Sequence, residues 1–194
     1  MDSEIKLMTG LHGRIAGPSL TVKWVPSRKP VDDYHTYIHA LQAIDDASRG
    51  DVYVAAIDGE TVPSPKNIAV FGGLMGTAAS VKGIAGIVLD GAMRDITDVE
   101  EAGLPCFAKS LTPFNVQTRA ETAGYNCRIC CGGVLVNPGD MIVGDRDGVV
   151  VIPIELVDFV VEEGRKITAT EALEIQELKG GTSLLKVLEE HARI

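Results

Sequence analysis

Two short, uninterrupted apolar runs limit most strongly what this chain can fold into. The first lies within residues 51–57 and the second within residues 84–89. Runs of this kind are typical of strands that are buried on both faces, because neither face is left to water. Between them, residues 74–81 are small and apolar, which suits a helix packed closely against a sheet. The pattern therefore predicts an α/β fold.

Glycines mark the two ends of this predicted helix. Gly72 and Gly73 precede it and Gly83 follows it. A helix that begins at glycines offers free backbone N–H groups to an anion. After the second strand, Asp90-Gly91 is predicted to turn the chain, and Arg94 and Asp95 follow in a loop.

Arg94 and Asp95 are the candidate site residues with the clearest chemistry. An arginine can bind a carboxylate through two parallel hydrogen bonds, and an aspartate suits a hard metal ion. A structural alternative stays open for Asp95, because aspartate is also a preferred N-cap and a helix is predicted over residues 96–102.

Further elements are predicted on both sides of this centre. Residues 15–25 favour a strand, and Asp32 or Asp33 can cap a helix that continues to Ser48. Residues 105–109 favour a short strand, and the chain is rich in strands and turns from Cys127 to Ile152. Two helices are predicted within residues 153–194, whereas residues 1–14 are interpreted as a loop or an arm.

Cys127 and Cys130 form a C-x-x-C pair, which invites a metal or redox interpretation. The surrounding sequence runs into Val134–Val136 like a strand, and side chains three apart on a strand point to opposite faces. We therefore interpret both as ordinary free cysteines.

Length and charge exclude several classes of function. The 194 residues fit a single domain, and the net charge of -9 argues against a general binder of nucleic acid or of anionic membranes. No apolar run is long enough to span a bilayer, and the N-terminus lacks the basic-then-apolar pattern of a secretion signal. The sequence predicts a cytoplasmic protein.

Several motifs together carry a resemblance to a known family. They are Gly13-Arg-Ile-Ala-Gly-Pro-Ser-Leu-Thr-Val22, Gly72-Gly-Leu-Met75, Gly86-Ile-Val-Leu-Asp-Gly-Ala-Met-Arg-Asp95, and Cys131-Gly-Gly-Val-Leu-Val-Asn-Pro-Gly-Asp140 with Asp147-Gly-Val-Val150. With them the chain resembles the family of the 4-hydroxy-4-methyl-2-oxoglutarate aldolases, which also contains the regulator of ribonuclease activity A. The resemblance covers most of the chain, up to the helix after Pro153.

The resemblance implies a fold and an assembly. The expected fold is a single-domain α/β sandwich with a mixed, partly barrel-like sheet of the swivelling-domain type, followed by a C-terminal helical arm. The expected assembly is a homotrimer or homohexamer with the site between subunits. Independently of the resemblance, a helical arm at the end of a one-domain chain often packs on a neighbouring subunit, so the sequence predicts an oligomer.

The resemblance also implies a class II, metal-dependent lyase that acts on a small 2-oxo acid of the pyruvate type. Arg94 would bind the substrate carboxylate together with the Gly72 loop and the backbone N–H groups of Leu74 and Met75. Asp95 would hold Mg²⁺ or Mn²⁺, and the metal would stabilise the pyruvate enolate. The implied reactions are decarboxylation of oxaloacetate and retro-aldol cleavage of 4-hydroxy-4-methyl-2-oxoglutarate.

The chain departs from the family pattern in its glycine loop. The aldolases carry an acidic residue where this chain has Gly73, and a glutamate from the arm of the next subunit also serves their site. Glu171 and Glu174 are the candidates here. The segment before Gly13 is also shorter than in the family. A non-catalytic regulator of ribonuclease activity, or another protein-binding ring, is the alternative that these departures favour. A methyltransferase is disfavoured, because no glycine-rich strand-to-helix motif with a following acidic residue is evident.

Overall fold

The computed structural model describes residues 1–10, 13–27, 33–58 and 64–191, which form two compact units. The first unit is Met1–Ile154 and the second is Glu155–Ile194. In the part of the chain that the structure describes, no helix has the length and apolar character needed to cross a membrane. The cap predicted at Asp32 or Asp33 lies outside the described side chains.

A mixed sheet is the framework of the first unit. Its order is β1-β6-β5-β3-β2-β10-β11, with β4 paired to β5 and β7 paired to β2. The pairs formed among β2, β3, β5 and β6 are parallel, and β4 is also parallel to β5, whereas β1, β7, β10 and β11 pair antiparallel. The strands are β1 (Lys6–Leu7), β2 (Ile15–Pro26), β3 (Val52–Ile57), β4 (Ala69–Phe71), β5 (Gly86–Met93), β6 (Cys106–Leu111), β7 (Ala120–Tyr125), β10 (Met141–Gly144) and β11 (Val149–Ile152).

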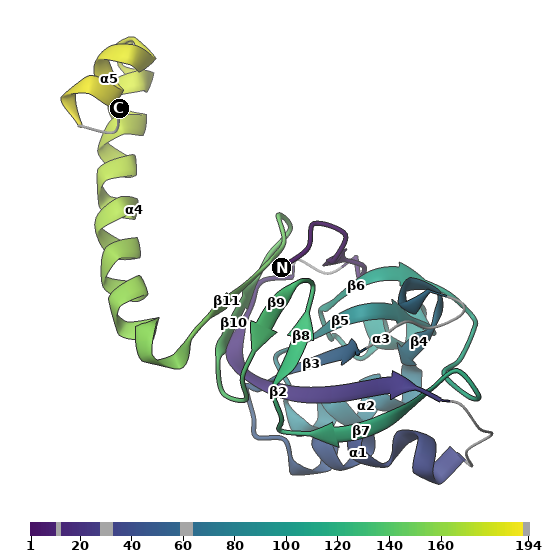
Figure 1. Cartoon of the computed structure of the whole chain (residues 1–194). Helices are drawn as coiled ribbons and strands as arrows, with labels where there is room; N and C mark the ends of the chain where they lie inside the picture. The colour runs from purple at the N-terminus through teal and green to yellow at the C-terminus, as the bar shows by residue number, and fades with distance from the viewer. Residues whose placement is uncertain (11–12, 28–32, 59–63, 192–194) are drawn as a thin grey trace. The chain divides into compact units, whose positions relative to one another are not determined.

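Both faces of the sheet are covered, as the continuous apolar runs predicted. On one face lie α1 (Asp33–Asp46), α2 (Gly73–Lys82) and α3 (Ile96–Glu101), and on the other lies the hairpin of β8 (Ile129–Cys131) and β9 (Val134–Val136) (Figure 1). Tyr53 on β3 belongs to the core on the helix face, whereas its neighbour Val54 belongs to the core beneath the hairpin. Alternate residues of one strand thus enter two cores, which requires an apolar residue at every position. This mixed, partly barrel-like α/β architecture confirms the predicted fold class.

The predicted central helix is confirmed as α2, and its end has a clear cause. Gly83 adopts a left-handed conformation with φ of 78°, and its N–H donates to carbonyl groups of the last turn of α2. A residue with a side chain is strained there, so glycine is the natural stop. The chain then enters β5, and Ile84 packs into the core of the helix face.

The turn predicted at Asp90-Gly91 is wrong. Both residues lie inside β5, which continues to Met93. Pairing with β4 and β6 keeps the strand extended past the glycine. The Asp90 carboxylate accepts the N–H of Gly132 at 2.7 Å and pairs with Lys109 Nζ at 2.6 Å, so tertiary contacts replace local turn formation.

Two further expectations differ from the structure. The segment before Gly13 contains β1, and Ile5 is buried in the core beneath the hairpin, so this segment is part of the folded unit rather than a loop or an arm. A strand running through Cys127 is also wrong, because Cys127 lies between β7 and β8. Cys127 and Cys130 are both free, as interpreted from the sequence.

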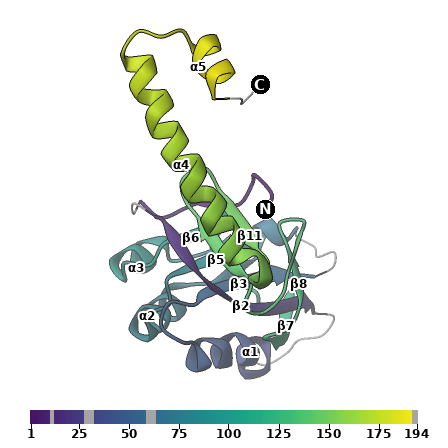
Figure 2. The ribbon, with the colours of Figure 1, turned by 90° about the vertical axis from the view of Figure 1, so that its left-hand side faces the viewer.

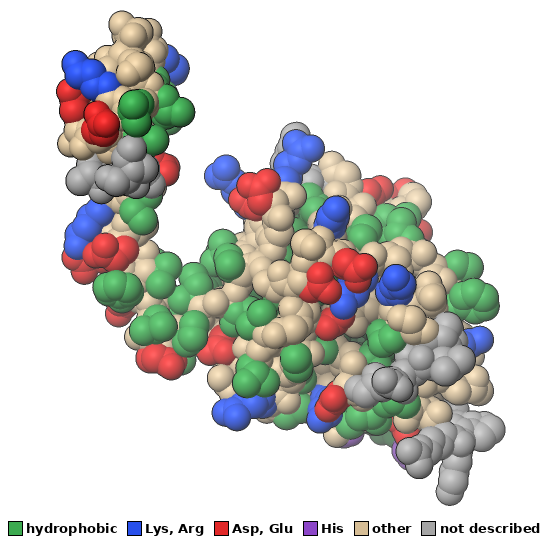
Figure 3. Space-filling model, turned by 45° about the horizontal axis from the view of Figure 1, so that its top comes forward, with side chains coloured by type: hydrophobic (Ala, Val, Ile, Leu, Met, Phe, Trp, Pro, Cys, Tyr) green, Lys and Arg blue, Asp and Glu red, His purple; other side chains and the backbone are tan. Residues whose placement is uncertain are grey.

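The second unit is helical. A short 3-10 helix at Ile154–Leu156 leads into α4 (Val157–Lys179), which continues without a break through Gly164, and α5 (Leu184–Glu190) follows (Figure 2). The Ser183 hydroxyl caps α5 by accepting the N–H of Lys186. Many apolar side chains of this unit are exposed on its surface (Figure 3), namely Leu156, Phe159, Val160, Val161, Ile167, Leu173, Ile175, Leu178, Leu184 and Leu185.

Candidate active site

The end of β5 and the start of α2 meet because β4 pairs with β5. Phe71, the last residue of β4, is in register with Met93, and the N–H of Arg94 donates to the Phe71 carbonyl at 3.0 Å. Gly72 and Gly73 follow β4 directly and begin α2. The structure therefore brings together the glycine loop and the Arg94–Asp95 pair that the sequence singled out.

Asp95 adopts an unusual conformation, and its carboxylate is turned towards the glycine loop. Its φ and ψ are 56° and 44°, in the left-handed region. Its Oδ2 atom accepts the N–H of Gly73 at 3.1 Å and lies 3.2 Å from Nη1 of Arg94. Non-glycine residues held in this region are often found at functional sites, where the surroundings compensate for the strain.

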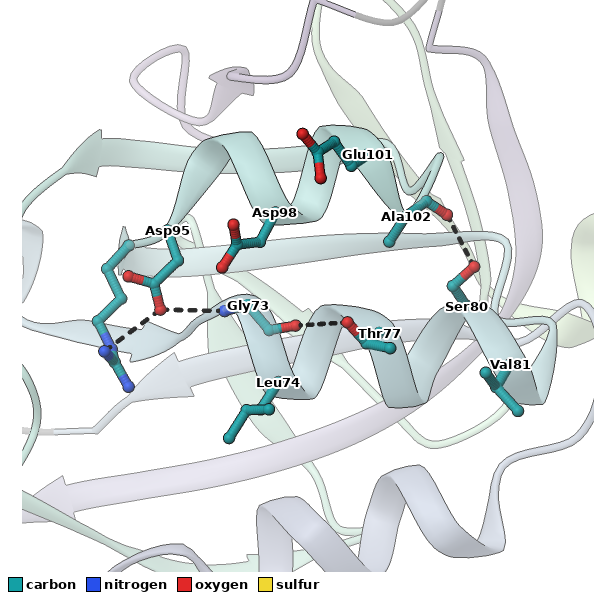
Figure 4. Close-up of a pocket in the computed structure, with 10 residues that line it drawn as sticks. Gly73, Leu74, Thr77, Ser80, Val81, Asp95, Asp98, Glu101 and Ala102 are labelled. Atoms are coloured by element: carbon teal, nitrogen blue, oxygen red, sulfur yellow. Dashed lines mark hydrogen bonds and ion pairs between the residues drawn. The ribbon is translucent and has the colours of Figure 1, made fainter.

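The alternative interpretation, that Asp95 serves only as the N-cap of α3, is not supported by its side chain. The residue occupies the N-cap position of α3, but its side chain makes no capping hydrogen bond. The carboxylate lies instead across the gap to α2 (Figure 4). Helix capping therefore does not explain why an aspartate stands here.

The first turn of α2 offers backbone donors beside this carboxylate. The N–H of Gly73 binds Asp95, and the N–H of Gly76 binds the Gly72 carbonyl at 2.9 Å. Gly72 has no side chain to cap the helix. Within the described residues, the N–H groups of Leu74 and Met75 are left without a partner, which is the arrangement that binds anions at helix starts.

Gly72 is required by the side chains packed against it. A Cβ atom at this position would lie 2.9 Å from Asp95 Oδ2 and 3.1 Å from Cγ and Nε of Arg94. These contacts are closer than side chains normally allow. Only glycine lets the arginine and the aspartate lie so close to the helix start.

The structure adds acidic residues that sequence reasoning missed. A cavity of about 610 Å³ lies between α2 and α3, and Asp98 and Glu101 line it together with Asp95 (Figure 4). Thr77 and Ser80 face them from α2. These residues could have been predicted from the sequence by their spacing from Asp95, because residues three apart on a helix lie on neighbouring positions of its surface.

Asp98 lies where a side chain at position 73 would have to go. A Cβ atom on Gly73 would be 2.5 Å from Oδ2 of Asp98 and 2.9 Å from its Cβ. The absence of an acidic residue in the loop is therefore matched by a carboxylate that arrives from α3.

Carboxylates are the groups of this site that suit a hard divalent cation. The Asp95 carboxylate is partly exposed, and its contacts with Gly73 and Arg94 are made by Oδ2, so Oδ1 can face a cation. In the described ranges, no group of three or more metal-ligating side chains is positioned to hold an ion. Mg²⁺ suits such a site, because it keeps several waters and binds proteins through one or two carboxylates.

Lys109 is a poor candidate for aldol chemistry through a Schiff base. Partial burial acts to lower the pKa of Lys109, but its hydrogen bonds with Asp90 and Asp2 act to raise it, and the net result is a pKa above the ordinary 10.5. A Schiff-base lysine must be neutral to attack a carbonyl, which requires a lowered pKa. The ion pairs make Lys109 a structural link between β5, β6 and the N-terminal segment.

The two glutamates predicted to serve a neighbouring subunit both lie on α4 of the second unit. Glu171 is exposed, whereas Glu174 is 6% exposed and buried within that unit. Exposure therefore favours Glu171, and the role of either residue stays a prediction.

Known proteins resemble this chain in sequence. An uncharacterized protein of Methanocaldococcus jannaschii is 33% identical over 174 residues, which is 90% of this chain and 77% of the relative. A protein of Halalkalibacterium halodurans named "Putative 4-hydroxy-4-methyl-2-oxoglutarate aldolase" is 33% identical over 155 residues, which is 80% of this chain and 67% of the relative.

Solved structures resemble it in fold. An uncharacterized protein of Pseudomonas syringae superposes with a TM-score of 0.80 at 27% identity, over 96% of this chain and 80% of that one. Streptomyces coelicolor RraAS2, described as an unusual member of the RNase ES inhibitor RraA protein family, superposes with a TM-score of 0.79 at 27% identity, over 89% of this chain and 82% of that one.

The fold and the site together define an RraA-like α/β domain. The family model described as RraA-like, Aldolase/RraA, matches residues 1–151. The chain therefore belongs to the Aldolase/RraA family, as its motifs predicted. This family has relatives named as aldolases and relatives named as RNase inhibitors.

Proposed function

We propose that this protein is a divalent-metal-dependent lyase that acts on 2-oxo acids of the pyruvate type. The observation that carries the proposal is the Asp95 carboxylate, held in a left-handed conformation between the Gly73 N–H and the Arg94 guanidinium. In support of this proposal, Asp95 lies beside the first turn of α2, whose N–H groups suit an anion, and its carboxylate suits a hard cation. A relative named as an aldolase supports the same class of reaction.

Each residue has a defined task in this proposal. Arg94 binds the substrate carboxylate, because its guanidinium pairs with Asp95 through Nη1 and has further N–H groups to offer. The N–H groups of Leu74 and Met75 bind the same carboxylate and orient it. Asp95 holds Mg²⁺ or Mn²⁺, which supplies Lewis-acid polarisation of the C2 carbonyl when bound.

Two reactions of this class make different demands on the site. Oxaloacetate loses CO₂ and needs no base, whereas retro-aldol cleavage needs a group that takes the proton of the C4 hydroxyl. The carboxylates of Asp98 and Glu101 lie in the same cavity as Asp95, so they are placed to order water for this proton transfer.

The test is pyruvate release from oxaloacetate with Mg²⁺ or Mn²⁺, in the presence and absence of a chelator. A rate above that of the metal alone, abolished by the chelator and restored by added metal, is expected. A rate equal to the metal-only blank with both oxaloacetate and 4-hydroxy-4-methyl-2-oxoglutarate would remove the lyase proposal.

A regulator of ribonuclease activity is the second candidate. Gly73 lacks the acidic side chain of the aldolases, and a structural neighbour is described as a member of an RNase inhibitor family. In that case the protein would inhibit RNA cleavage by an RNase E-type enzyme without turning over any 2-oxo acid. Inhibition assays run beside the pyruvate assay separate the two functions.

Restoring an acid at position 73 is expected to favour aldol cleavage over decarboxylation. Gly73→Asp alone should fold poorly, because its side chain meets Asp98. The pair Gly73→Asp with Asp98→Ala makes room and should raise the ratio of aldol cleavage to decarboxylation above that of Asp98→Ala alone. An unchanged ratio in two well-folded variants would contradict the role assigned to this loop.

The exposed apolar side chains of α4 predict a homo-oligomer. The α4 helix has 23 residues and leaves the apolar side chains of Phe159, Ile167 and Leu173 about half exposed. Burial of these side chains against another subunit would remove apolar surface from water. We expect a trimer or hexamer by light scattering, and Phe159→Glu with Ile167→Glu should lower the measured mass. A monomeric wild-type mass at micromolar concentration would rule this out.

A further inference from the structure

A second cavity lies on another side of Arg94 and is not used by the reaction steps described above. Its volume is about 330 Å³, and it shares Leu74 and Arg94 with the larger cavity of the candidate active site. Its other walls are Tyr34, Tyr37, Leu41, Ala69, Phe71 and Met75. We call it the apolar cavity.

The walls of the apolar cavity are held by the fold. Tyr34, Tyr37 and Leu41 follow each other at spacings of three and four on α1, so they share one face of that helix. Tyr37 packs edge-on against the buried Trp24, with ring centroids 5.7 Å apart. Phe71 packs on the buried Tyr53 at 5.4 Å. The cavity is therefore a formed feature of the first unit.

The two cavities that meet at Arg94 differ in charge. Asp95, Asp98 and Glu101 line the larger one, whereas Arg94 is the only charged side chain among the described residues that line the apolar cavity. In Figure 4 the Leu74 side chain points away from Asp95 and Asp98. A ligand whose carboxylate binds Arg94 thus meets carboxylates and water on one side and aromatic and aliphatic side chains on the other.

We propose that the apolar cavity binds the group carried by C4 of the substrate, and that this group is an uncharged alkyl or aromatic group. This inference rests on the proposed lyase function and narrows its substrate class to 4-hydroxy-2-oxo acids with an apolar tail. Leu41, Phe71 and Met75 offer a second carboxylate no hydrogen bond, so in this cavity it would have to keep its own water or reach the tyrosine hydroxyl groups of the wall. Each buried methylene of an apolar tail should instead improve binding about fourfold.

Retro-aldol cleavage of such a substrate needs no oxidant, reductant or co-substrate. In R–CH(OH)–CH₂–CO–COO⁻ the C3–C4 bond breaks and its electron pair stays on C3. The C4 hydroxyl loses its proton to water in the carboxylate-lined cavity, and C3 takes a proton from solvent. The products are an aldehyde R–CHO and pyruvate.

The first measurement compares two substrates on the full chain with Mg²⁺. We expect kcat/KM for 4-hydroxy-2-oxo-4-phenylbutanoate to exceed that for 4-hydroxy-4-methyl-2-oxoglutarate by tenfold or more, because one tail is apolar and the other charged. Equal values, or a preference for the carboxylated substrate, would overturn the inference.

Leu41→Arg should reverse this preference, with Gln42→Arg as the matched control. Leu41 is 42% exposed, so the change is tolerated by the fold, and the arginine adds a cation to the apolar cavity. Gln42 is exposed on the same helix and outside the cavity lining, and it receives the same charge. The phenyl-to-carboxylate ratio should fall at least tenfold in Leu41→Arg and stay unchanged in Gln42→Arg. The same ratio in both variants would contradict the assignment.

Binding of unreactive acids separates this inference from the proposed lyase function. Calorimetry with Mg²⁺ should show 2-oxo-4-phenylbutanoate, which carries its ring on C4, binding more tightly than 2-oxoglutarate, with the order reversed by Leu41→Arg. If this holds without turnover of any 2-oxo acid, the apolar cavity stands and the lyase proposal fails. If turnover occurs with a preference for carboxylated acids, the lyase stands and this inference fails. If neither acid binds and neither is turned over, both fail.

Discussion

Asp95→Ala is expected to abolish the metal-dependent part of pyruvate release, with a fall of about 10³-fold or more in kcat/KM. The carboxylate is the proposed ligand of the cation, and alanine leaves no oxygen in its place. The measurement is the rate with oxaloacetate as a function of Mg²⁺ or Mn²⁺ concentration. Loss of activity should be accompanied by loss of the metal dependence, because both depend on one carboxylate.

A second variant, Asp95→Asn, separates the effect of the negative charge from the effect of packing. Asparagine has nearly the same shape, tolerates the left-handed conformation and can still accept the Gly73 N–H, but it carries no charge. If charge and not packing is what matters, it should be as inactive as Asp95→Ala while remaining as stable as the wild type. Asp147→Ala, in an exposed turn, is the control and should behave as wild type. An Asp95→Ala protein that keeps full metal-dependent activity would mean that the metal ligand is elsewhere.

Arg94→Ala should give a different signature. Its loss removes the proposed carboxylate partner, so KM should rise together with a fall in kcat, while the dependence on metal concentration persists. Arg94→Lys restores the charge but not the planar pair of donors, and it should recover only part of the activity.

Gly17→Ala is expected to destabilise the fold strongly, because among the described glycines it has the closest contact for an added Cβ atom. A Cβ atom on Gly17 would lie 2.0 Å from the carbonyl oxygen of Gly50, which is a backbone atom. Gly50 cannot easily retreat, because its N–H donates to the Gly83 carbonyl at 2.9 Å. Gly17 is itself held in register opposite Ile142. Overpacking against fixed backbone should cost about 3 kcal/mol or more.

The measurement is thermal or urea unfolding followed by circular dichroism. For a chain of this size the expected fall in Tm is about 6–12 °C. Gly91→Ala is the matched control, since it is also a strand glycine, but its nearest contact would be an ordinary 3.6 Å from the Pro65 carbonyl oxygen. Gly91→Ala should leave Tm nearly unchanged or raise it slightly. Equal values of Tm for the two variants would contradict the close approach of β2 to Gly50.

The central strands β3 and β5 were predictable from local pattern, whereas β1 was not. Residues 52–57 are apolar throughout because β3 supplies side chains to two cores. The helix after Gly73 and its end at Gly83 followed from residue type, because a left-handed stop selects glycine. Where local pattern and tertiary pairing disagreed, at Asp90-Gly91, pairing with β4 and β6 prevailed.

Some residues of the candidate site could likewise be identified from the sequence, and others could not. Arg94, Asp95 and the glycine loop were identified from their chemistry and order in the chain. The acidic neighbour Asp98 and the apolar wall of Tyr34 and Leu41 were not, because their proximity to Arg94 arises from elements far apart in sequence or from a helix whose orientation is set by packing.

Local sequence pattern was enough to identify the central buried strands, the end of the central helix, and the arginine and aspartate that follow a buried strand. These properties depend on neighbouring residues alone. The folded structure was needed to show that Asp95 turns its carboxylate to Gly73 instead of capping α3, and that Arg94 lies between an acidic and an apolar cavity. The reason is physical: the direction of a side chain at a strand end is fixed by the β4–β5 pairing and the packing of α2 against α3, which no local pattern records.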